Sequence, residues 1–249
     1  MKAFLTICLL GFSAYSLQAG VEDLVRKGDV HDKRFESAEA LKYYLPAEKL
    51  DPDNADLLVK IARQYVYEMD ETSDKNAQMT LGKTALAYAG RAIKLAPKKS
   101  DSWLAEAICW GKLTPLLSVR EQMEASRKIK IDAEEAVKLD VSNDYAWHLL
   151  GRWHQALAAM STFKKGLAQA VYGSLPNASN EDALKCFQKA VALNPNRLIH
   201  YIELGRTYAQ MDKPDEARIF IQKGLSMPNR EKDDSDSKLR GKQTLDTLK

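Results

Sequence analysis

A short pattern of small and apolar residues recurs along the chain, and it constrains the fold more than any other feature. In the copy at Ala183, an apolar residue follows four positions later at Phe187, and a small residue follows at Ala190. This spacing puts all three side chains on one face of a helix, and the small ones allow a second helix to approach closely. A turn follows at the same distance each time. The copies begin at Ala40, Ala85, Ile129, Ala183 and Ala217.

A second pattern follows four of these turns at a constant offset. It runs Tyr201-x-x-Leu204-Gly205-x-x-Tyr208 in one copy, and the others begin at Leu58, Trp103 and Trp147. This is the spacing of helix A in a tetratricopeptide repeat, and the first pattern is that of helix B. The sequence therefore predicts an all-α fold, a tetratricopeptide-repeat-like right-handed helical solenoid.

The repeats are elongated and irregular. Their turns fall at residues 52, 97, 141, 195 and 229, and only the last interval matches the standard length of about 34 residues. We expect the additional residues between helix A and helix B, as a polar loop over 68–76 and a long helix over 144–172. Pro115 should kink or end the helix that starts near residue 101, because proline disrupts a helix interior.

The chain divides by composition into three segments. Lys2, an apolar run over 3–10 and a small residue at Ala19 predict a signal peptide over 1–19. We therefore expect an exported protein, periplasmic or secreted, that is not transmembrane after cleavage; an uncleaved anchor is the alternative. Residues 20–229 form the predicted solenoid, and 230–249 form a charged capping helix or tail.

Several classes of chemistry find no support in the sequence. The net charge of +3 gives no argument for a nucleic acid partner. Phosphate-binding glycine loops, a nucleophile elbow and paired-cysteine zinc spacings are all missing, so we expect no enzyme, no cofactor and no metal. His148 and His154 are too poorly aligned on a helix to share a metal. Cys109 and Cys186 stand at apolar helical positions and should be buried and free, with a single disulfide as the alternative.

The stretch 148–236 resembles the regulator of microtubule dynamics family. The resemblance lies in Leu150-Gly151-Arg152-Trp153, in a Gly-x-x-Pro-x-Ala loop over 173–178 and in the Ala-Leu helix that begins at Ala183. It implies a helical repeat domain without enzymatic activity, with relatives linked to microtubules and to organelle membranes, including phospholipid binding. The chain departs from the family in its apparent signal peptide, and in His154 and Gln155 where the family has Cys-Tyr.

A partner of a solenoid binds on the concave face, which is built from the A helices. The residue two positions past each leucine or its equivalent should point to that face, which selects Arg63, Ile108, Arg152 and Arg206. An arginine row suits an acidic peptide, a C-terminal carboxylate or a lipid headgroup. Alternatively, each arginine pairs with an acid such as Asp56, Asp101 or Glu203. The predicted binding residues are Arg63, Tyr145, His148, Arg152, Gln155, Arg206 and Gln210, with Ile202 nearby.

These observations predict a non-enzymatic scaffold that binds a protein or peptide partner, an anionic peptide among the candidates. A phospholipid- or fatty-acid-binding helical repeat is the alternative, with an anionic lipid as ligand. A third interpretation, a microtubule-associated protein, applies if the chain is eukaryotic.

Overall fold

The structure is a computed structural model, and it describes residues 18–160, 165–166, 169 and 177–248. Within these ranges every regular element is a helix. The all-α, tetratricopeptide-like class predicted from the two patterns is confirmed. The predicted signal peptide lies outside the described residues apart from its last two, Gln18 and Ala19.

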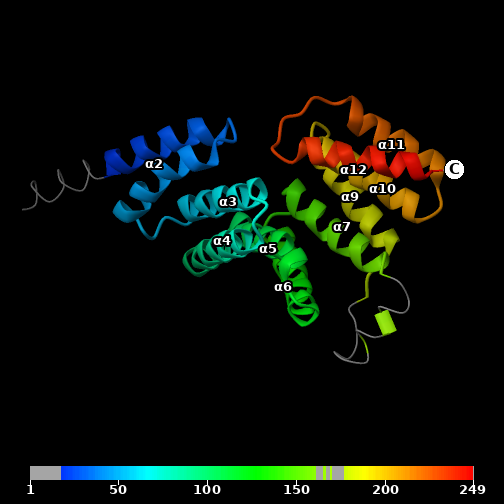
Figure 1. Ribbon diagram of the computed structural model, residues 1–249, viewed down its shortest axis with the longest axis horizontal. Coiled ribbons are helices and arrows are strands. Elements are labelled where there is room, and N and C mark those ends of the chain that lie inside the picture. Colours follow the sequence, from blue (N-terminus) through cyan, green and yellow to red (C-terminus); the bar gives the residue numbers. More distant parts are fainter. Residues whose placement is uncertain (1–17, 161–164, 167–168, 170–176, 249) are drawn as a thin grey trace, which may run out of the picture. The chain divides into compact units, whose positions relative to one another are not determined.

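The chain forms two compact units, which divide the predicted solenoid between Ala125 and Ser126. Unit 1 contains a helix over residues 18–32, α2 (Ser37–Leu50), α3 (Ala55–Glu71), α4 (Lys75–Leu95), α5 (Ser100–Leu113) and the 3-10 turn η1 (Thr114–Leu116). Unit 2 contains most of α6 (Val119–Leu139), then α7 (Asp144–Ala158), α9 (Asn180–Leu193), α10 (Leu198–Gln210), α11 (Pro214–Ser226) and α12 (Asp234–Thr247) (Figure 1).

Four turns between successive helices share one hydrogen-bond pattern. In the turn after α9, the amide of Asn194 donates to the carbonyl of Ala190, and the amide of Arg197 donates to the carbonyl of Asn194. The same two bonds recur in the turns that follow Ala47, Ala92 and Ala136. These alanines are fully buried, so the helix carbonyls that would otherwise lack partners are satisfied where neighbouring helices pack.

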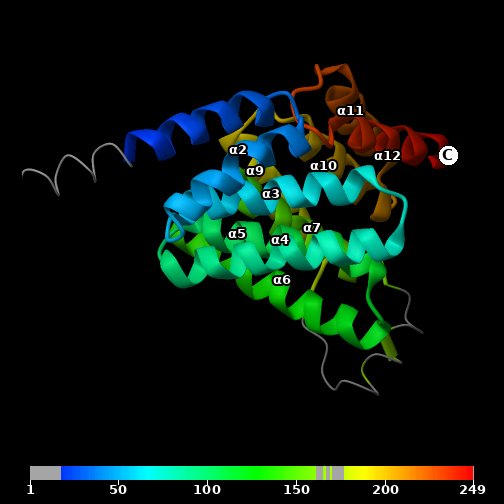
Figure 2. The same cartoon turned by 60° about the vertical axis from the view of Figure 1, so that its left-hand side comes forward.

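Small residues allow the two helices of each pair to cross closely. Figure 2 shows α3 and α4 side by side, and Ala62 of α3 is buried with Ala85 and Ala89 of α4. In α10, a Cβ atom added at Gly205 would lie 2.9 Å from the carbonyl oxygen of Ala217 on α11. The recurring small residue therefore sets the distance between paired helices, as the sequence predicts.

The helix over residues 18–32 is an A helix that the sequence patterns did not reveal. Gly28 lies directly against the ring of Tyr44 on α2, as Gly151 lies against Phe187 in unit 2. Its spacing, Leu24-x-x-Lys27-Gly28-x-x-His31, matches the A pattern except that lysine replaces leucine. This substitution hid the motif.

Two predicted connections differ from the structure. The expected loop over 68–76 is only three residues long, because α3 continues to Glu71, with Met69 buried, and Asp74 caps the start of α4. The long helix expected over 144–172 ends at Ala158, where the amide of Ala159 bonds back to Gln155. The helix end predicted at Pro115 is confirmed by η1.

The charged residues after 230 include α12, which packs on α10 and α11. Gly241 lies against Ile202 and Ile221, and Leu245 joins the same apolar cluster. Over the ranges that the structure describes, none of the helices combines the length and apolar character needed to cross a bilayer.

We expect Gly205→Ala to lower the free energy of unfolding by about 1–3 kcal/mol, because the new methyl group would press on the backbone of α11. Gly111→Ala is the matched control: its methyl group would meet nothing within 4 Å, so better helix propensity should raise stability by roughly 0.5–1 kcal/mol. Urea unfolding of both variants measures the difference, and equal effects would contradict the close crossing.

Candidate functional site

A single buried glutamate organises the polar face of unit 2. Glu203 on α10 is 0% exposed, and three arginines from three helices surround its carboxylate. Arg152 Nη1 of α7 lies 2.6 Å from Oε1, Arg206 Nη1 of α10 donates to Oε2 at 2.7 Å, and Arg240 Nε of α12 lies 3.4 Å from Oε1. We call these four residues the Glu203 cluster.

The Glu203 cluster carries more positive than negative charge. Burial alone would raise the pKa of Glu203, but the three guanidinium groups outweigh it and hold the pKa at about 2. Burial lowers the pKa of Arg206, and its like-charged neighbours Arg152 and Arg240 lower it further against the attraction of Glu203. Among the described residues, Glu203 is the one carboxylate that pairs with these arginines. The cluster therefore has two positive charges in excess.

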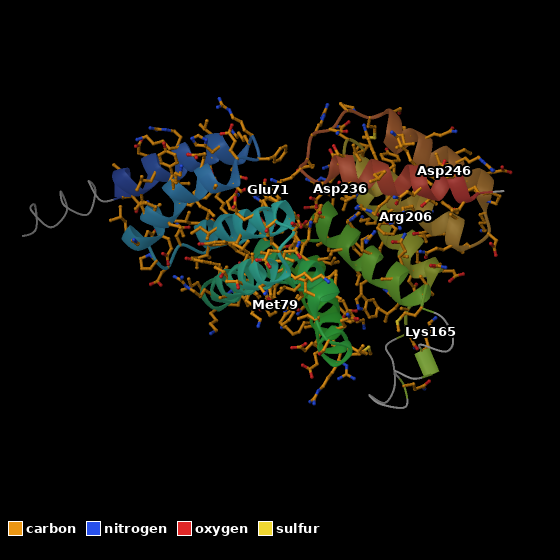
Figure 3. The ribbon with its side chains drawn as sticks, in the orientation of Figure 1. Glu71, Met79, Lys165, Arg206, Asp236 and Asp246 are labelled. Atoms are coloured by element: carbon orange, nitrogen blue, oxygen red, sulfur yellow. The ribbon has the colours of Figure 1, made fainter. Side chains whose placement is uncertain are left out.

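The three arginines remain accessible at the outer side of the cluster. Their side chains are 37% (Arg152), 24% (Arg206) and 35% (Arg240) exposed. Figure 3 shows Arg206 on α10 close to α12, whose Thr244 accepts a hydrogen bond from its Nε. Each of the three side chains is therefore partly exposed to solvent, although Nη1 of Arg152 is itself buried.

Buried polar contacts fix α7 against α10 beneath the cluster. Gln155 Nε2 donates to Thr207 Oγ1 at 2.9 Å and to the carbonyl of Glu203 at 3.2 Å. Thr207 Oγ1 in turn donates to the same carbonyl. These bonds hold the helices that carry Arg152 and Arg206 in one register.

Two histidines form the second polar feature of unit 2. His148 on α7 and His200 on α10 are 2% and 0% exposed, and their Nδ1 atoms lie 3.0 Å apart. His200 Nε2 lies 2.8 Å from Asp144 Oδ2, and Arg197 also donates to that oxygen. Burial lowers the pKa of both histidines, most strongly for His148.

The structure changes the roles of several predicted site residues. His148 and Gln155 were expected to be accessible to a partner, but α10 covers both, and they bond within the protein. Tyr145 lies between His148 and Arg197, whose guanidinium carbon is 5.1 Å from its ring centre. Gln210 is exposed at the end of α10.

Arg63 and Ile202 do not join the Glu203 cluster. Arg63 lies in unit 1, where it pairs with Asp32, which also accepts from Gln64 Nε2 at 2.9 Å. Ile202 is fully buried against Gly224 and Gly241. Arg152 and Arg206 pair with Glu203, which is the geometry that the pairing alternative describes. Whether they also bind a partner stays a prediction.

Sequence reasoning missed His200 and Arg240. His200 lies one residue before the A pattern of α10, and it meets His148 only because α7 and α10 pack together. Arg240 lies in a segment that the repeat patterns do not reach. Cys109 and Cys186, by contrast, are buried and free as predicted, and burial raises the pKa of each thiol to about 12.

Comparison with known proteins places the chain in a family. The family model described as regulator of microtubule dynamics protein 1-3 matches residues 24–249. The chain belongs to this family. The match extends the resemblance seen at 148–236 over both units.

Curated members of the family align along nearly the whole chain. Regulator of microtubule dynamics protein 1 of Mus musculus is 24% identical over 98% of this chain and 83% of its own length. Regulator of microtubule dynamics protein 2 of Macaca fascicularis is 24% identical over 96% of this chain and 58% of its own length.

Solved structures support the fold alone. A thermophilic TPR protein of Thermus thermophilus is similar with a TM-score of 0.65 and 16% identity, covering 90% of this chain and 98% of that one. The pilF protein of Pseudomonas aeruginosa is similar with a TM-score of 0.57 and 13% identity, covering 94% and 90%. The likeness to the Thermus thermophilus TPR protein confirms the tetratricopeptide-like fold in this member of the regulator of microtubule dynamics family.

Glu203→Gln should lower the free energy of unfolding at pH 7 by about 3 kcal/mol, because it leaves the arginines without their counter-charge. The lowered pKa means that this contribution is full above the ordinary value of 4.5 and declines as the pH falls towards 2. Urea unfolding between pH 7 and pH 3 should show the gap to the wild type narrowing. Glu181→Gln, an exposed site on α9, serves as control, and an equal loss there would contradict the assignment.

Proposed function

We propose that this chain is a protein-interaction scaffold that binds an acidic segment of a partner at the Glu203 cluster. The observation that carries the proposal is the excess of charge, three arginines around one fully buried carboxylate. Three guanidinium groups held beside one carboxylate repel one another, because a single negative charge neutralises only one of them. An incoming anion would remove that repulsion.

The chemistry of the arginines favours carboxylates. A guanidinium group presents a planar fork that matches the two oxygens of a carboxylate. Arg206 uses Nη1 for Glu203 and Nε for Thr244, which leaves its Nη2 for a ligand. Two carboxylates, from neighbouring acidic side chains of a peptide, would neutralise the cluster.

The helices that carry the arginines of the Glu203 cluster are held in fixed positions, and this favours specific binding of a ligand. The Gln155–Thr207 bond and the burial of Glu203 fix the arginine-bearing helices before a ligand arrives. Such preorganisation reduces the entropy lost on binding. The thiols of Cys109 and Cys186 are buried, and their raised pKa keeps them protonated. Because the thiolate is the nucleophilic form of cysteine, this supports a role in which neither cysteine attacks a substrate.

Arg206→Gln should weaken binding of a fluorescein-labelled peptide of six alternating Asp and Glu residues about tenfold in fluorescence anisotropy, because a charge-assisted hydrogen bond is worth about 1.5–3 kcal/mol. The variant keeps Glu203 paired with Arg152 and Arg240, so the fold should persist. Wild-type affinity should also fall as salt rises.

The matched control is Arg120→Gln, which removes the same charge from an exposed site on α6. Equal weakening in both variants would show that the peptide responds to net charge alone. An absence of wild-type binding at low salt would overturn the proposal.

Family membership favours a second candidate, association with microtubules, because the relatives are named regulators of microtubule dynamics. The two candidates differ in compartment, since the signal peptide predicted over 1–19 would take the protein away from microtubules. Co-sedimentation of residues 20–249 with polymerised tubulin tests it. The Arg206→Gln protein should pellet less than the wild type if the Glu203 cluster makes the contact, and a wild-type chain that stays in the supernatant would exclude this candidate.

A further inference from the structure

The paired imidazoles beside the Glu203 cluster form a hydrogen-bonded chain with one end on a carboxylate. Asp144 Oδ2, His200 and His148 follow one another at 2.8 and 3.0 Å. Both rings are buried, so neither can exchange these partners for water. This series of hydrogen bonds begins at Asp144 on α7, crosses to His200 on α10 and returns to His148 on α7.

These contacts fix which nitrogens carry protons. Asp144 is held as a carboxylate: burial opposes this, but the bond from His200 and the charge of Arg197 lower its pKa. His200 Nε2 must therefore donate to Asp144, which leaves His200 Nδ1 as an acceptor in the neutral ring. His148 Nδ1 then carries the proton between the rings. The free lone pair of neutral His148 is on Nε2, where a further proton can add without breaking either bond.

The surroundings of His148 oppose that further proton. Burial disfavours the charged ring, and His200, Arg152, Arg197 and Arg240 add positive charge. Arg152 lies one helical turn along α7 from His148, and Arg240 acts on it electrostatically from α12. The groups that surround the two histidines come from four helices and two loops: Asp144, Tyr145 and Arg152 of α7, Phe187 of α9, His200 and His148 themselves, Arg240 of α12, Arg197 just before α10 and Glu231 just before α12.

Two of the cations that oppose the proton, Arg152 and Arg240, belong to the Glu203 cluster. Glu203 neutralises only part of their charge. An anion bound to these arginines would offset their positive charge and so raise the pKa of His148. Because such coupling is reciprocal, a proton on His148 would in turn raise the affinity for the anion.

We propose that binding of an anionic segment at the Glu203 cluster is coupled to uptake of one proton by His148 at Nε2, so that acidification strengthens binding. This rests on the function proposed above, and it adds a regulation to that site. The proton comes from solvent, and the ring becomes an imidazolium that still donates from Nδ1 to His200. No covalent bond changes apart from the new N–H.

The test uses a peptide whose own charge does not change with pH. In a labelled hexapeptide of cysteic acid, every sulfonate stays ionised between pH 5.5 and 7.5. Anisotropy should show wild-type affinity rising about tenfold between pH 7.5 and pH 5.5, because His148 stays neutral in the free protein over this range while the complex takes up a proton, and each pH unit below the raised pKa of bound His148 multiplies the affinity tenfold. Equal affinities would overturn the coupling.

His148→Gln separates this group from the other three histidines of the chain. Its side-chain amide can still donate to His200 Nδ1, so binding at pH 7.5 should persist and the gain at pH 5.5 should disappear. His31→Gln, which lies in unit 1 and contacts Glu36, is the matched control and should keep the gain. A gain retained by His148→Gln, or one lost in His31→Gln, would refute the assignment.

Calorimetry of the wild type gives a readout that depends on no variant. The heat of binding at pH 6, measured in two buffers of different ionisation enthalpy, should reveal a net uptake of protons. Binding that needs Arg206 but takes up no proton would refute the coupling and leave the proposed function standing. If the peptide does not bind at either pH, both proposals fall.

Discussion

The structure depends on how closely paired helices can approach each other. Where α7 crosses α9 and α10 crosses α11, a glycine on the A helix lets a larger side chain fill the space above it, as Phe187 does over Gly151 and Ile221 over Gly205. Four of the turns that join a B helix to the next A helix then have the same geometry. In each, a backbone amide of the turn donates to the carbonyl of a buried alanine. Regular packing follows from local contacts, which is why insertions between the helices do not destroy the fold.

The hydrogen bonds and ion pairs between successive A helices differ between the two units. In unit 1 an aspartate, Asp32, meets Arg63 and Gln64. In unit 2, α7 and α10 meet through two histidines, a glutamine–threonine bond and a glutamate shared by arginines. Apolar residues would have sufficed for stability, since buried ion pairs are weak contributors to it. The polar set in unit 2 is the feature on which the proposed binding of an anionic segment rests.

The sequence was sufficient for the fold because the small residues recur in phase with the helix. The constant offset from the A-helix leucine selected Arg152 and Arg206, which the structure places together at Glu203, while their predicted role in binding stays a prediction. Sequence reasoning failed for His148 and Gln155, which a single helix presents outwards but which the neighbouring α10 covers. It failed for Arg240 because α12 carries no repeat signature, and for Gly28 because Lys27 replaced the expected leucine. Contacts between helices, rather than patterns within one, decide these positions.

The position of α12 has a consequence for how unit 2 matures. This helix is strongly polar, yet it supplies Arg240 to Glu203 and Thr244 to Arg206, and it covers Ile202 with Gly241. Its residues leave the ribosome after those of the other helices of unit 2. Until then, Glu203 has only two of its three arginines and Ile202 is uncovered. Packing of α12 on the other helices therefore supplies two things to unit 2 in one step: cover for the apolar side chain of Ile202 and the third positive charge beside Glu203.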